Sequence, residues 1–325
     1  MRVFVAGGAG YIGSVVTEFL LAAGHEVVVY DNLSHGFRAA VPEGAVFVEG
    51  DIGDGERVVE TLRRWPCRAA MHFAAFIEAG ESMREPLRYF ANNVGKTIAF
   101  LEALRAAGVD RVVFSSTAAV YAPRPEPLTE EAPIGPVNVY GETKWMVEQI
   151  LGWLHRTQGL RAAVLRYFNA GGATAARGED HRPESHLIPN ILAVALGRRP
   201  FVEIYGTDYP TRDGTCVRDY IHVADLARAH LVMLEALEER PWLVYNVGTG
   251  VGYTVREVLA VCRAVTGHPI PAVEGPRRPG DAPILVASAE ALRRDWGWAP
   301  QHDLRDIVES AWRWMRAHPW GYGVC

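Results

Sequence analysis

Short apolar runs that alternate with amphipathic stretches constrain the fold of this chain more than any other feature. In the first half, "RVFVAG" is followed by "SVVTEFLLAAGH", whose apolar residues have helical spacing. Continuously apolar strands separated by helices indicate a parallel sheet covered on both faces. The pattern therefore predicts an α/β fold with a doubly wound parallel sheet. The expected strands are 2–7, 26–31, 45–51, 69–75 and 111–116, with helices near 54–65, 92–107 and 140–157.

The second half predicts a smaller domain built from separate segments. Residues 171–185 are rich in Gly, Ala, Arg, Asp, Glu and Pro without periodicity, which indicates a long functional loop. "LVYNVGTG" has the character of a late strand that returns to the main sheet. We expect a cofactor domain over 1–168 with a return segment at about 219–247, and a C-terminal substrate domain over 169–218 and 248–325.

Composition excludes several classes of function. The 325 residues are 49% apolar with a net charge of −5 and no acidic or basic blocks, so neither a nucleic-acid partner nor a membrane anchor is expected. No apolar run approaches the roughly 18 residues of a membrane span. The cysteines lack zinc-ligand or disulfide-framework spacing, so we expect no metal and a cytoplasmic protein. They are Cys67, Cys216, Cys262 and Cys325.

A glycine-rich turn follows the first expected strand. Gly7, Gly10 and Gly13 precede a helical stretch, where glycine lets a pyrophosphate approach backbone N–H groups at the positive helix end. Asp31 ends the second strand. A carboxylate there can accept hydrogen bonds from both ribose hydroxyls of an adenosine, and it repels a 2′-phosphate. The pattern predicts a Rossmann-type site that prefers NAD to NADP. A simple turn role is the weaker alternative for Asp31, whereas for Asp51 a turn role and an adenine contact are equally favoured.

The chain contains only two lysines, Lys96 and Lys144, among 33 lysine and arginine residues. Lys144 follows Tyr140 by four residues, so both lie on one face of a helix if this stretch is helical. A phenol titrates at about pH 10 and needs nearby positive charge to act as a base at neutral pH. A compact ammonium can supply that charge and also bind a ribose. The pair indicates a catalytic base, against the alternative of an incidental pair on a solvated helix; Lys96 has no such context and no predicted role.

Several motifs together resemble one family. "FSSTAAVYA" places Thr117 at the carboxyl end of a strand, where ligands bind in this architecture, although such a run alone more often caps a helix. Together with "GGAGYIG", "YGETK", "LRYFNAGGA", "YNVGTG" and "RRPGD", it makes the chain resemble the extended short-chain dehydrogenase/reductases. Over nearly the full length, the resemblance is to the UDP-glucose 4-epimerases among them.

This resemblance implies reversible C4 epimerisation of UDP-galactose and UDP-glucose through a transient 4-keto sugar with tightly bound NAD. It makes Tyr140 the general base and acid and Thr117 a proton-relaying hydroxyl. Lys144 would bind the nicotinamide ribose and lower the pKa of Tyr140. The positions that match cofactor contacts are Gly7, Gly10, Tyr11, Ile12, Gly13, Asp31, Asn32, Asp51, Ile52, Phe73, Ala74, Ala75, Asn92, Tyr140, Lys144 and Phe168.

The resemblance also implies a set of substrate contacts. Arg218 and Arg278 match positions that hold the uridine diphosphate, and guanidinium groups suit phosphate oxygens. The other matching positions are Thr117, Asn169, His186, Leu187, Glu203, Ile204, Tyr205, Asp281 and Leu285.

Three of this chain's residues depart from the family pattern. Ile77 replaces a cofactor-contacting lysine of some relatives. His186 replaces an asparagine and could equally be a loop residue. Leu285 is intermediate in size at a position that limits N-acetylated sugars, so UDP-glucose and UDP-galactose are favoured.

Alternative functions remain within and outside this chemistry. UDP-N-acetylhexosamines or UDP-pentoses are alternative epimerase substrates. A 4,6-dehydratase needs an acid pair after the threonine, where this chain has Ala118 and Ala119. A non-enzymatic dinucleotide sensor could keep the glycine turn but has no need of Tyr140 and Lys144. The family pairs through two helices, here near 92–107 and 140–157, which predicts a homodimer; the apolar residues of those helices could also face the monomer core.

Overall fold

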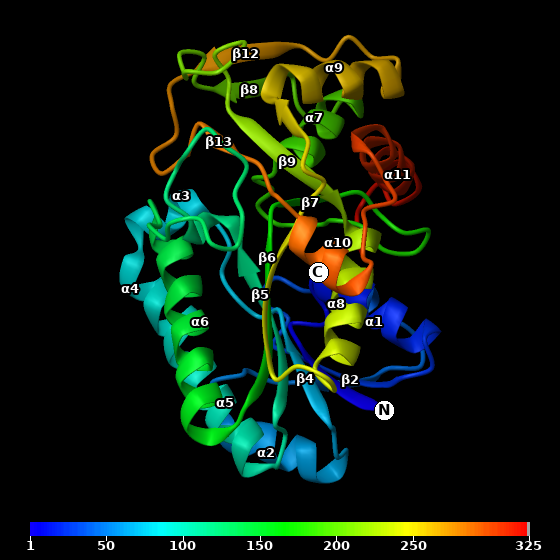
Figure 1. The fold of residues 1–325 in the computed structure, drawn as a ribbon. Helices are drawn as coiled ribbons and strands as arrows, with labels where there is room; N and C mark the ends of the chain where they lie inside the picture. The colour runs from blue at the N-terminus through cyan, green and yellow to red at the C-terminus, as the bar shows by residue number, and fades with distance from the viewer. Residues whose placement is uncertain (324–325) are drawn as a thin grey trace. The chain divides into compact units, whose positions relative to one another are not determined.

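The computed structural model describes residues 1–323, and its largest sheet has seven strands (Figure 1). In spatial order its strands are β10 (Trp242–Val247), β6 (Arg161–Tyr167), β5 (Arg111–Thr117), β4 (Ala69–His72), β1 (Arg2–Ala6), β2 (Glu26–Asp31) and β3 (Val46–Glu49). The pairs from β5 through β3 are parallel, and the winding reverses between β1 and β4. The predicted doubly wound parallel sheet is confirmed, and the late strand β10 joins it as expected.

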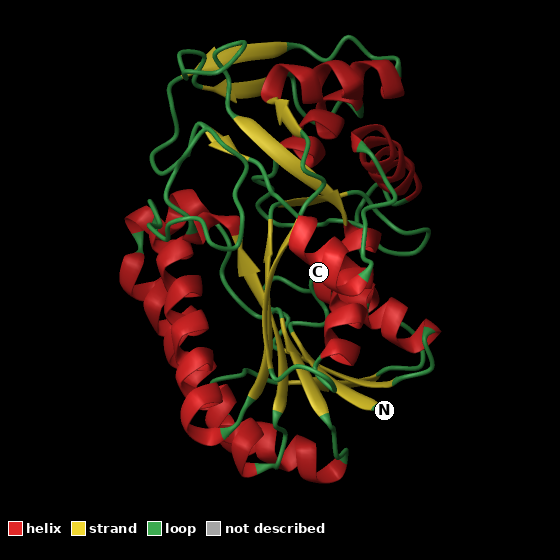
Figure 2. Cartoon of the chain, in the orientation of Figure 1, coloured by secondary structure: helices red, strands yellow, loops and turns green. Residues whose placement is uncertain are grey.

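Helices cover both faces of this sheet (Figures 1 and 2). They are α1 (Tyr11–Ala22), α2 (Gly55–Arg64), α5 (Lys96–Ala106), α6 (Val139–Gln158) and α8 (Val223–Ala236). Leu62 of α2, Phe100 of α5 and Val147 of α6 pack with strand side chains in one buried cluster. Burial from both sides explains why the strands are apolar throughout their length.

The segment before α5 is wound differently from the simple helix that the sequence predicted near 92–107. Short helices α3 (Ala79–Arg84) and α4 (Pro86–Tyr89) lead into a π-helical turn at Phe90–Gly95, and only then does α5 begin. Turns of this kind are rare and often occur at functional sites. Asn92 and Asn93 therefore lie in an irregular turn.

The remaining elements form smaller sheets and a helical layer. Strand β9 (Val217–His222) pairs with β7 (Asn169–Gly171), β11 (Gly252–Thr254) and β13 (Ile284–Leu285), whereas β8 (Val202–Tyr205) pairs with β12 (Ala272–Gly275). The helices are α7 (Leu187–Ala195), α9 (Val255–Thr266), α10 (Glu290–Trp296) and α11 (Leu304–Ala317), and short 3₁₀ turns occur at Arg38–Ala40 and Ala118–Val120. Ile191, Leu259 and Ile307 join α7, α9 and α11 in a second buried core. Within residues 1–323, no helix has the length and apolar content needed to cross a bilayer.

The chain divides into two compact units. The first comprises Met1–Val120, Asn138–Arg166 and Ala227–Tyr245; the second comprises Tyr121–Val137, Tyr167–Leu226 and the chain from Asn246. Residues 121–137 belong to the second unit because Leu128 N donates to Val286 O at 2.8 Å, and Tyr121 Oη donates to Asn246 Oδ1 at 2.7 Å.

Truncation of Phe100 tests the packing of α5 on the sheet. Phe100 is fully buried beside Phe4, with ring centroids 5.7 Å apart. Phe100→Ala should lower the free energy of unfolding by about 3–5 kcal/mol, because a cavity remains after the ring is removed. Urea denaturation followed by tryptophan fluorescence measures this change. Glu102→Ala, at an exposed position of the same helix, is the control; equal effects of both variants would contradict the assigned packing.

Candidate functional site

The glycine turn leads directly from β1 into α1. Gly7 has a φ of +79°, and a Cβ there would lie 2.6 Å from the backbone nitrogen of Ala74. A Cβ on Gly13 would lie 2.2 Å from the Gly7 carbonyl oxygen. Gly10 is the N-cap residue, and it makes no side-chain hydrogen bond to the first turn of α1. The glycines therefore add no side-chain bulk to this turn, which fits a pyrophosphate at the start of the helix.

Asp31 is a nearly buried carboxylate at the end of β2. Its Oδ2 accepts a hydrogen bond from Ala9 N at 2.9 Å, and its Oδ1 accepts one from Leu33 N at 2.9 Å. Burial raises the pKa of Asp31, while the bonds from the Leu33 and Ala9 N–H groups lower it. Each carboxylate oxygen can accept a further bond. Asp31 thus shapes the turn and retains the capacity to bind two ribose hydroxyls.

Lys96, for which the sequence predicted no role, is paired with Asp51. Its Nζ lies 2.6 Å from Asp51 Oδ2, which also accepts from Asn32 Nδ2 at 2.9 Å. Gly53 N donates to the other oxygen at 2.8 Å. Burial raises the pKa of the Asp51 carboxyl, but these hydrogen bonds outweigh it and the pKa is lowered. Lys96 therefore contacts a predicted cofactor residue, and Lys144 is itself one. The rarity of lysine in this chain could have indicated a role for both residues, but sequence reasoning assigned one to Lys144 alone.

Asn93, beside the predicted Asn92, organises the loop after β4. Its Oδ1 accepts from Phe76 N at 2.8 Å, and its Nδ2 donates to Phe76 O at 3.0 Å and to Thr143 Oγ1 at 3.1 Å. This buried amide therefore ties the loop that carries Phe73 to α6. Sequence reasoning selected Asn92 and missed Asn93; the adjacent pair of asparagines was the available signal.

The predicted cofactor positions are distributed between the two units. All of them except Phe168 belong to the first unit. Tyr11 and Ile12 begin α1, Ile52 is buried after β3, and the Phe73–Ala75 segment follows β4. Phe73 N donates to Ala6 O at 2.8 Å, which brings this segment beside the glycine turn.

Helix α6 places Tyr140 and Lys144 one turn apart. Asn138 caps the helix by accepting a hydrogen bond from Gly141 N at 2.8 Å, and Gly159 ends it with a φ of +73°. Tyr140 N donates to Ser82 Oγ at 3.1 Å, which fixes the first turn against α3. The helix predicted near 140–157 is confirmed, and the two side chains share its face.

Tyr140 has a raised pKa in the protein alone. Burial raises the pKa of its phenol to about 12; a hydrogen bond with Thr117 lowers it, and the negative charge of Glu78 raises it further. Lys144 Nζ lies 6.0 Å from the centroid of the phenol ring. Burial is the largest cause of this raised pKa, and the lowering of the Tyr140 pKa by Lys144 stays a prediction. The contact with Thr117 does bring together two of the three predicted catalytic groups.

Lys144 is almost completely buried. Its Nζ donates to Ser115 O at 2.8 Å and lies 5.0 Å from the centroid of the Phe114 ring. Burial lowers the pKa of Lys144 to about 7, and the negative charge of Glu148 opposes that effect. His72 is buried nearby and stays neutral, with its pKa lowered to about 3 by burial and by Lys144. Lys144 is thus balanced between its charged and neutral forms at neutral pH.

Glu148, which sequence reasoning missed, anchors this face of α6 to the sheet. Arg166 of β6 donates from Nε to Glu148 Oε1 at 3.0 Å and from Nη2 to Oε2 at 2.6 Å. Ser116 Oγ of β5 donates to the same carboxylate. Both members of the ion pair are buried, and Glu148 lies one turn after Lys144. The spacing Tyr140, Lys144, Glu148 is the signal that could have identified it.

In the second unit, the predicted substrate residues form a cationic group. Asp281 Oδ2 lies 3.0 Å from Arg278 Nε, and its Oδ1 lies 3.7 Å from Arg218 Nη2. The Arg278 guanidinium lies 5.3 Å from the centroid of the Tyr205 ring, and Leu285 is the strand partner of Arg218. One carboxylate between two guanidinium groups leaves a net positive charge, which suits a diphosphate.

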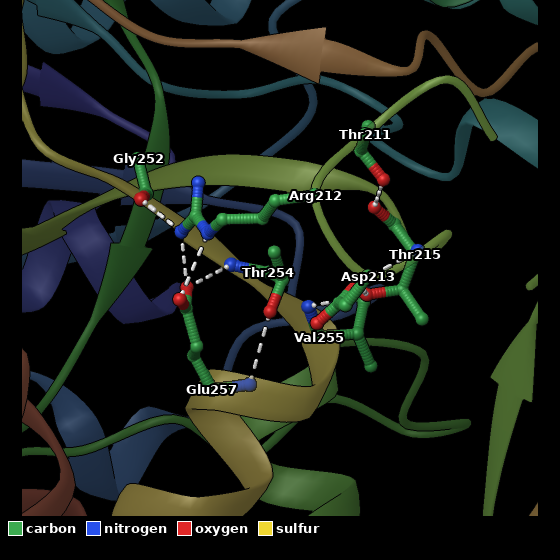
Figure 3. Close-up of polar contacts among 8 residues, drawn as sticks. All are labelled: Thr211, Arg212, Asp213, Thr215, Gly252, Thr254, Val255 and Glu257. Carbon is green, nitrogen blue, oxygen red and sulfur yellow. Dashed lines mark hydrogen bonds and ion pairs between the residues drawn. The ribbon is translucent and has the colours of Figure 1, made fainter.

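A network beside β9 and β11 holds the strand that carries Arg218 (Figure 3). Arg212 donates to Gly252 O at 2.8 Å and pairs with Glu257. Thr254 and Glu257 form a capping box at the start of α9. Val255 N donates to Thr215 Oγ1 at 3.1 Å, which joins the loop before β9 to the same helix end. These contacts fix the β9–β11 register, in which Tyr253 faces Arg218.

The other predicted substrate residues occupy separate places in the second unit. Asn169 pairs in register with Tyr220 between β7 and β9. His186 precedes α7, whose first residue is Leu187, and contacts carboxylates of its own loop. Glu203 and Ile204 lie on β8. The pKa of Tyr205 is raised mainly by burial and further by a hydrogen bond with Glu203.

Comparison with known proteins agrees with this arrangement. Residues 3–248 match the model of the NAD dependent epimerase/dehydratase family. The chain belongs to this family.

Relatives within the NAD dependent epimerase/dehydratase family match over the full chain. The UDP-glucose 4-epimerase of Streptomyces lividans is 50% identical over 99% of this chain and 98% of its own length. The structure of the enzyme from Stenotrophomonas maltophila with NAD and formylated UDP-arabinopyranose has a TM-score of 0.94 and 42% identity, covering 98% of this chain and 99% of that one. The Bifidobacterium longum enzyme with NAD+ and UDP has a TM-score of 0.96 and 35% identity, covering 99% and 100%.

Replacing Glu148 tests the electrostatics around Lys144. Glu148→Gln keeps the side-chain shape but removes a negative charge that favours the ammonium, so the pKa of Lys144 should fall below about 7. The buried Arg166 also loses its counter-charge, which should destabilise the fold by about 3–5 kcal/mol. Because the chain has only two lysines, NMR titration of ¹⁵N-lysine-labelled protein resolves Lys144, with Lys96→Arg as the assignment control.

Glu142→Gln on the same helix is the matched control and should leave the pKa of Lys144 unchanged. A folded Glu148→Gln protein whose Lys144 titrates as in the wild type would contradict this account.

Because the folded pKa of Lys144 is below its unfolded value of about 10.4, the unfolded chain binds more protons between these values. The contribution of Lys144 to stability should therefore rise as the pH increases from about 7 towards 10.

Proposed function

We propose that this chain interconverts UDP-galactose and UDP-glucose by epimerisation at C4, with NAD as its cofactor. The observation that carries the proposal is the placement of Tyr140 and the buried Lys144 one turn apart on α6, with Lys144 Nζ 6.0 Å from the centroid of the phenol ring. Thr117 lies beside Tyr140 and lowers its pKa. These groups lie in the same unit as the glycine turn and Asp31. Full-length similarity to UDP-glucose 4-epimerases supports the choice of substrate.

Tyr140 is the group that removes and returns the proton of the sugar 4-hydroxyl. With a pKa of about 12, the phenol is a weak acid in the protein alone, so positive charge must be added to form the phenolate at neutral pH. Thr117 already lowers that pKa and can relay the proton between the sugar hydroxyl and Tyr140.

Lys144 has a binding role and an electrostatic one. One of its three N–H donors is used by Ser115 O at 2.8 Å, which leaves donors for a ribose hydroxyl. Its pKa of about 7 lets a modest gain of negative charge nearby return it to the ammonium form. An arginine could not change its charge in this way.

The residues of the first unit fit NAD. Gly7, Gly10 and Gly13 would receive the pyrophosphate, and Asp31 and Lys144 the two riboses. When bound, NAD reversibly accepts the hydride of the sugar C4. Because the reaction has no net redox change, the purified protein should act without added cofactor.

Retention of the 4-keto sugar depends on anchoring its nucleotide. Arg218 and Arg278 offer two guanidinium groups around Asp281 for the diphosphate. With the nucleotide fixed, the sugar can present its other face to Tyr140. Leu285, the strand neighbour of Arg218, favours hexoses without an acetamido group, and UDP-N-acetylhexosamines or UDP-pentoses are the alternative substrates.

Two other functions fit less well. A 4,6-dehydratase needs acidic side chains after Thr117, and the 3₁₀ turn that follows presents Ala118 and Ala119 instead. A dinucleotide sensor would not need a buried lysine and a threonine directed at Tyr140.

Substitution of Tyr140 tests the proposed chemistry. Tyr140→Phe should retain bound NAD, seen by absorbance and mass spectrometry, but lose about 10²- to 10⁴-fold in turnover because no group accepts the 4-hydroxyl proton. Interconversion is measured with a panel of UDP-sugars and no added cofactor. Tyr322→Phe, which removes a tyrosine hydroxyl that hydrogen-bonds the Gly178 backbone in the second unit, is the control. Turnover close to the wild type in Tyr140→Phe would remove Tyr140 from this role.

The proposal includes a cytoplasmic homodimer. Cys67, Cys216 and Cys262 are buried free thiols, which is typical of a reducing compartment. Ile98 of α5 and Trp153 of α6 expose 42% and 61% of their surface. Large apolar side chains exposed on both helices favour their use in pairing over burial in the monomer core.

A charge on the exposed face of α6 tests the homodimer. Trp153→Glu should shift the protein to monomers, because an unpaired carboxylate would be buried in the interface. Trp320→Glu, at a tryptophan that is 76% exposed in the other unit, is the matched control and should stay dimeric. Sedimentation velocity over a range of concentrations measures both variants. A monomeric wild type, or a dimeric Trp153→Glu protein, would contradict the proposed interface.

A further inference from the structure

Two histidines and two glutamates meet in the loop between β7 and α7. Glu179, His181, Glu184 and His186 each place one potential ligand atom within 4.8 Å of the other three. All four side chains are partly buried. The spacing, Glu-x-His-x-x-Glu-x-His, differs from the cysteine-based patterns on which the expectation of no metal rested, so a separate explanation is required for this cluster.

The contacts within the cluster converge on shared atoms. Glu179 Oε1 lies 3.1 Å from His181 Nδ1 and 2.9 Å from His186 Nδ1. His186 Nδ1 also lies 2.8 Å from Glu184 Oε1. A ring nitrogen carries at most one hydrogen, so His186 Nδ1 cannot donate a linear bond to both carboxylates. A metal ion bonds to several such atoms at once, which makes these distances better suited to a cation than to a proton.

A cavity beside the cluster contains further polar atoms without partners. It has a volume of about 170 Å³, and Glu179, His181 and Glu184 line it. Asn190 and Trp314 line it as well, and Asn190 Oδ1 and Trp314 Nε1 are buried without a hydrogen-bond partner. Trp314 is only 4% exposed. Buried unpaired polar atoms are costly, and water bound to an ion could satisfy both an amide oxygen and an indole N–H.

We infer that Glu179, His181, Glu184 and His186 form a binding site for a divalent transition metal such as Zn²⁺. Two carboxylates balance the charge of the ion, and two imidazoles supply nitrogen ligands typical of zinc. Because all four ligands come from one loop, the ion closes that loop before the first turn of α7. The site includes His186, which the resemblance gave as a substrate contact, but it contains none of Tyr140, Thr117 and Lys144, and the inference goes beyond the proposed function.

The cavity also indicates which metal the site selects. Arg198 and Arg199 line it, and their charges oppose a cation held by electrostatic attraction alone. Strong bonds to imidazole are therefore required for binding. Zn²⁺ and Co²⁺ form such bonds, whereas Mg²⁺ prefers oxygen ligands and retains its water. We expect Zn²⁺ and Co²⁺ to bind and Mg²⁺ to fail at the same concentration.

Metal titration of the full-length protein tests the site. After dialysis against a chelator, Co²⁺ should bind at one equivalent and produce visible absorption bands of a low-symmetry site, which Zn²⁺ abolishes. His181→Asn should weaken binding by at least the 10- to 100-fold that loss of a supporting contact costs. His268→Asn, at an exposed histidine outside the cluster, should bind as the wild type does.

The inference is overturned if the wild type binds no more Co²⁺ than His181→Asn, or if Mg²⁺ competes equally. Isothermal titration with Zn²⁺ compares the wild type with a second variant, Glu184→Gln, which should also bind the metal more weakly. The test therefore still applies if His181→Asn fails to fold. Turnover of UDP-galactose is measured separately in the wild type. Metal binding without turnover would overturn only the proposed function, and turnover without metal binding would overturn only this site.

Discussion

The buried ion pair between Glu148 and Arg166 is the interaction on which the geometry of the candidate site depends. It joins α6 to β6, and Ser116 joins the same carboxylate to β5. The helix that carries Tyr140 and Lys144 is therefore held against the sheet at a fixed rotation. A buried pair of this kind contributes little net stability, since desolvation offsets the attraction. The pair instead orients α6 on the sheet, and the Glu148 carboxylate places a negative charge close to the buried Lys144.

Burial shifts the pKa values of Tyr140 and Lys144 in opposite directions. Desolvation disfavours the charged form of each group, so it raises the pKa of Tyr140 to about 12 and lowers that of Lys144 to about 7. Strongly perturbed groups that face one another are a common feature of catalytic sites. The protein thus holds a buried phenol with a raised pKa one helical turn from a buried lysine with a lowered pKa.

The second unit handles charge differently. Arg218 and Arg278 flank Asp281 and leave a net positive group for an anionic ligand. The loop before α7 gathers two glutamates and two histidines, whose potential ligand atoms lie within 4.8 Å of one another. Different segments of the second unit build these two groups: Arg218, Arg278 and Asp281 form one, and the loop residues 179–186 form the other.

The sequence by itself determined the doubly wound sheet, the glycine turn and the shared face of Tyr140 and Lys144. Each follows from local rules, because strand burial, turn geometry and helical spacing depend on near neighbours in the chain. Only the tertiary structure decided the pairing of Lys96 with Asp51, the anchoring of α6 by Arg166, and the raised pKa of Tyr140. These depend on side chains from distant segments and on desolvation, which no local pattern records.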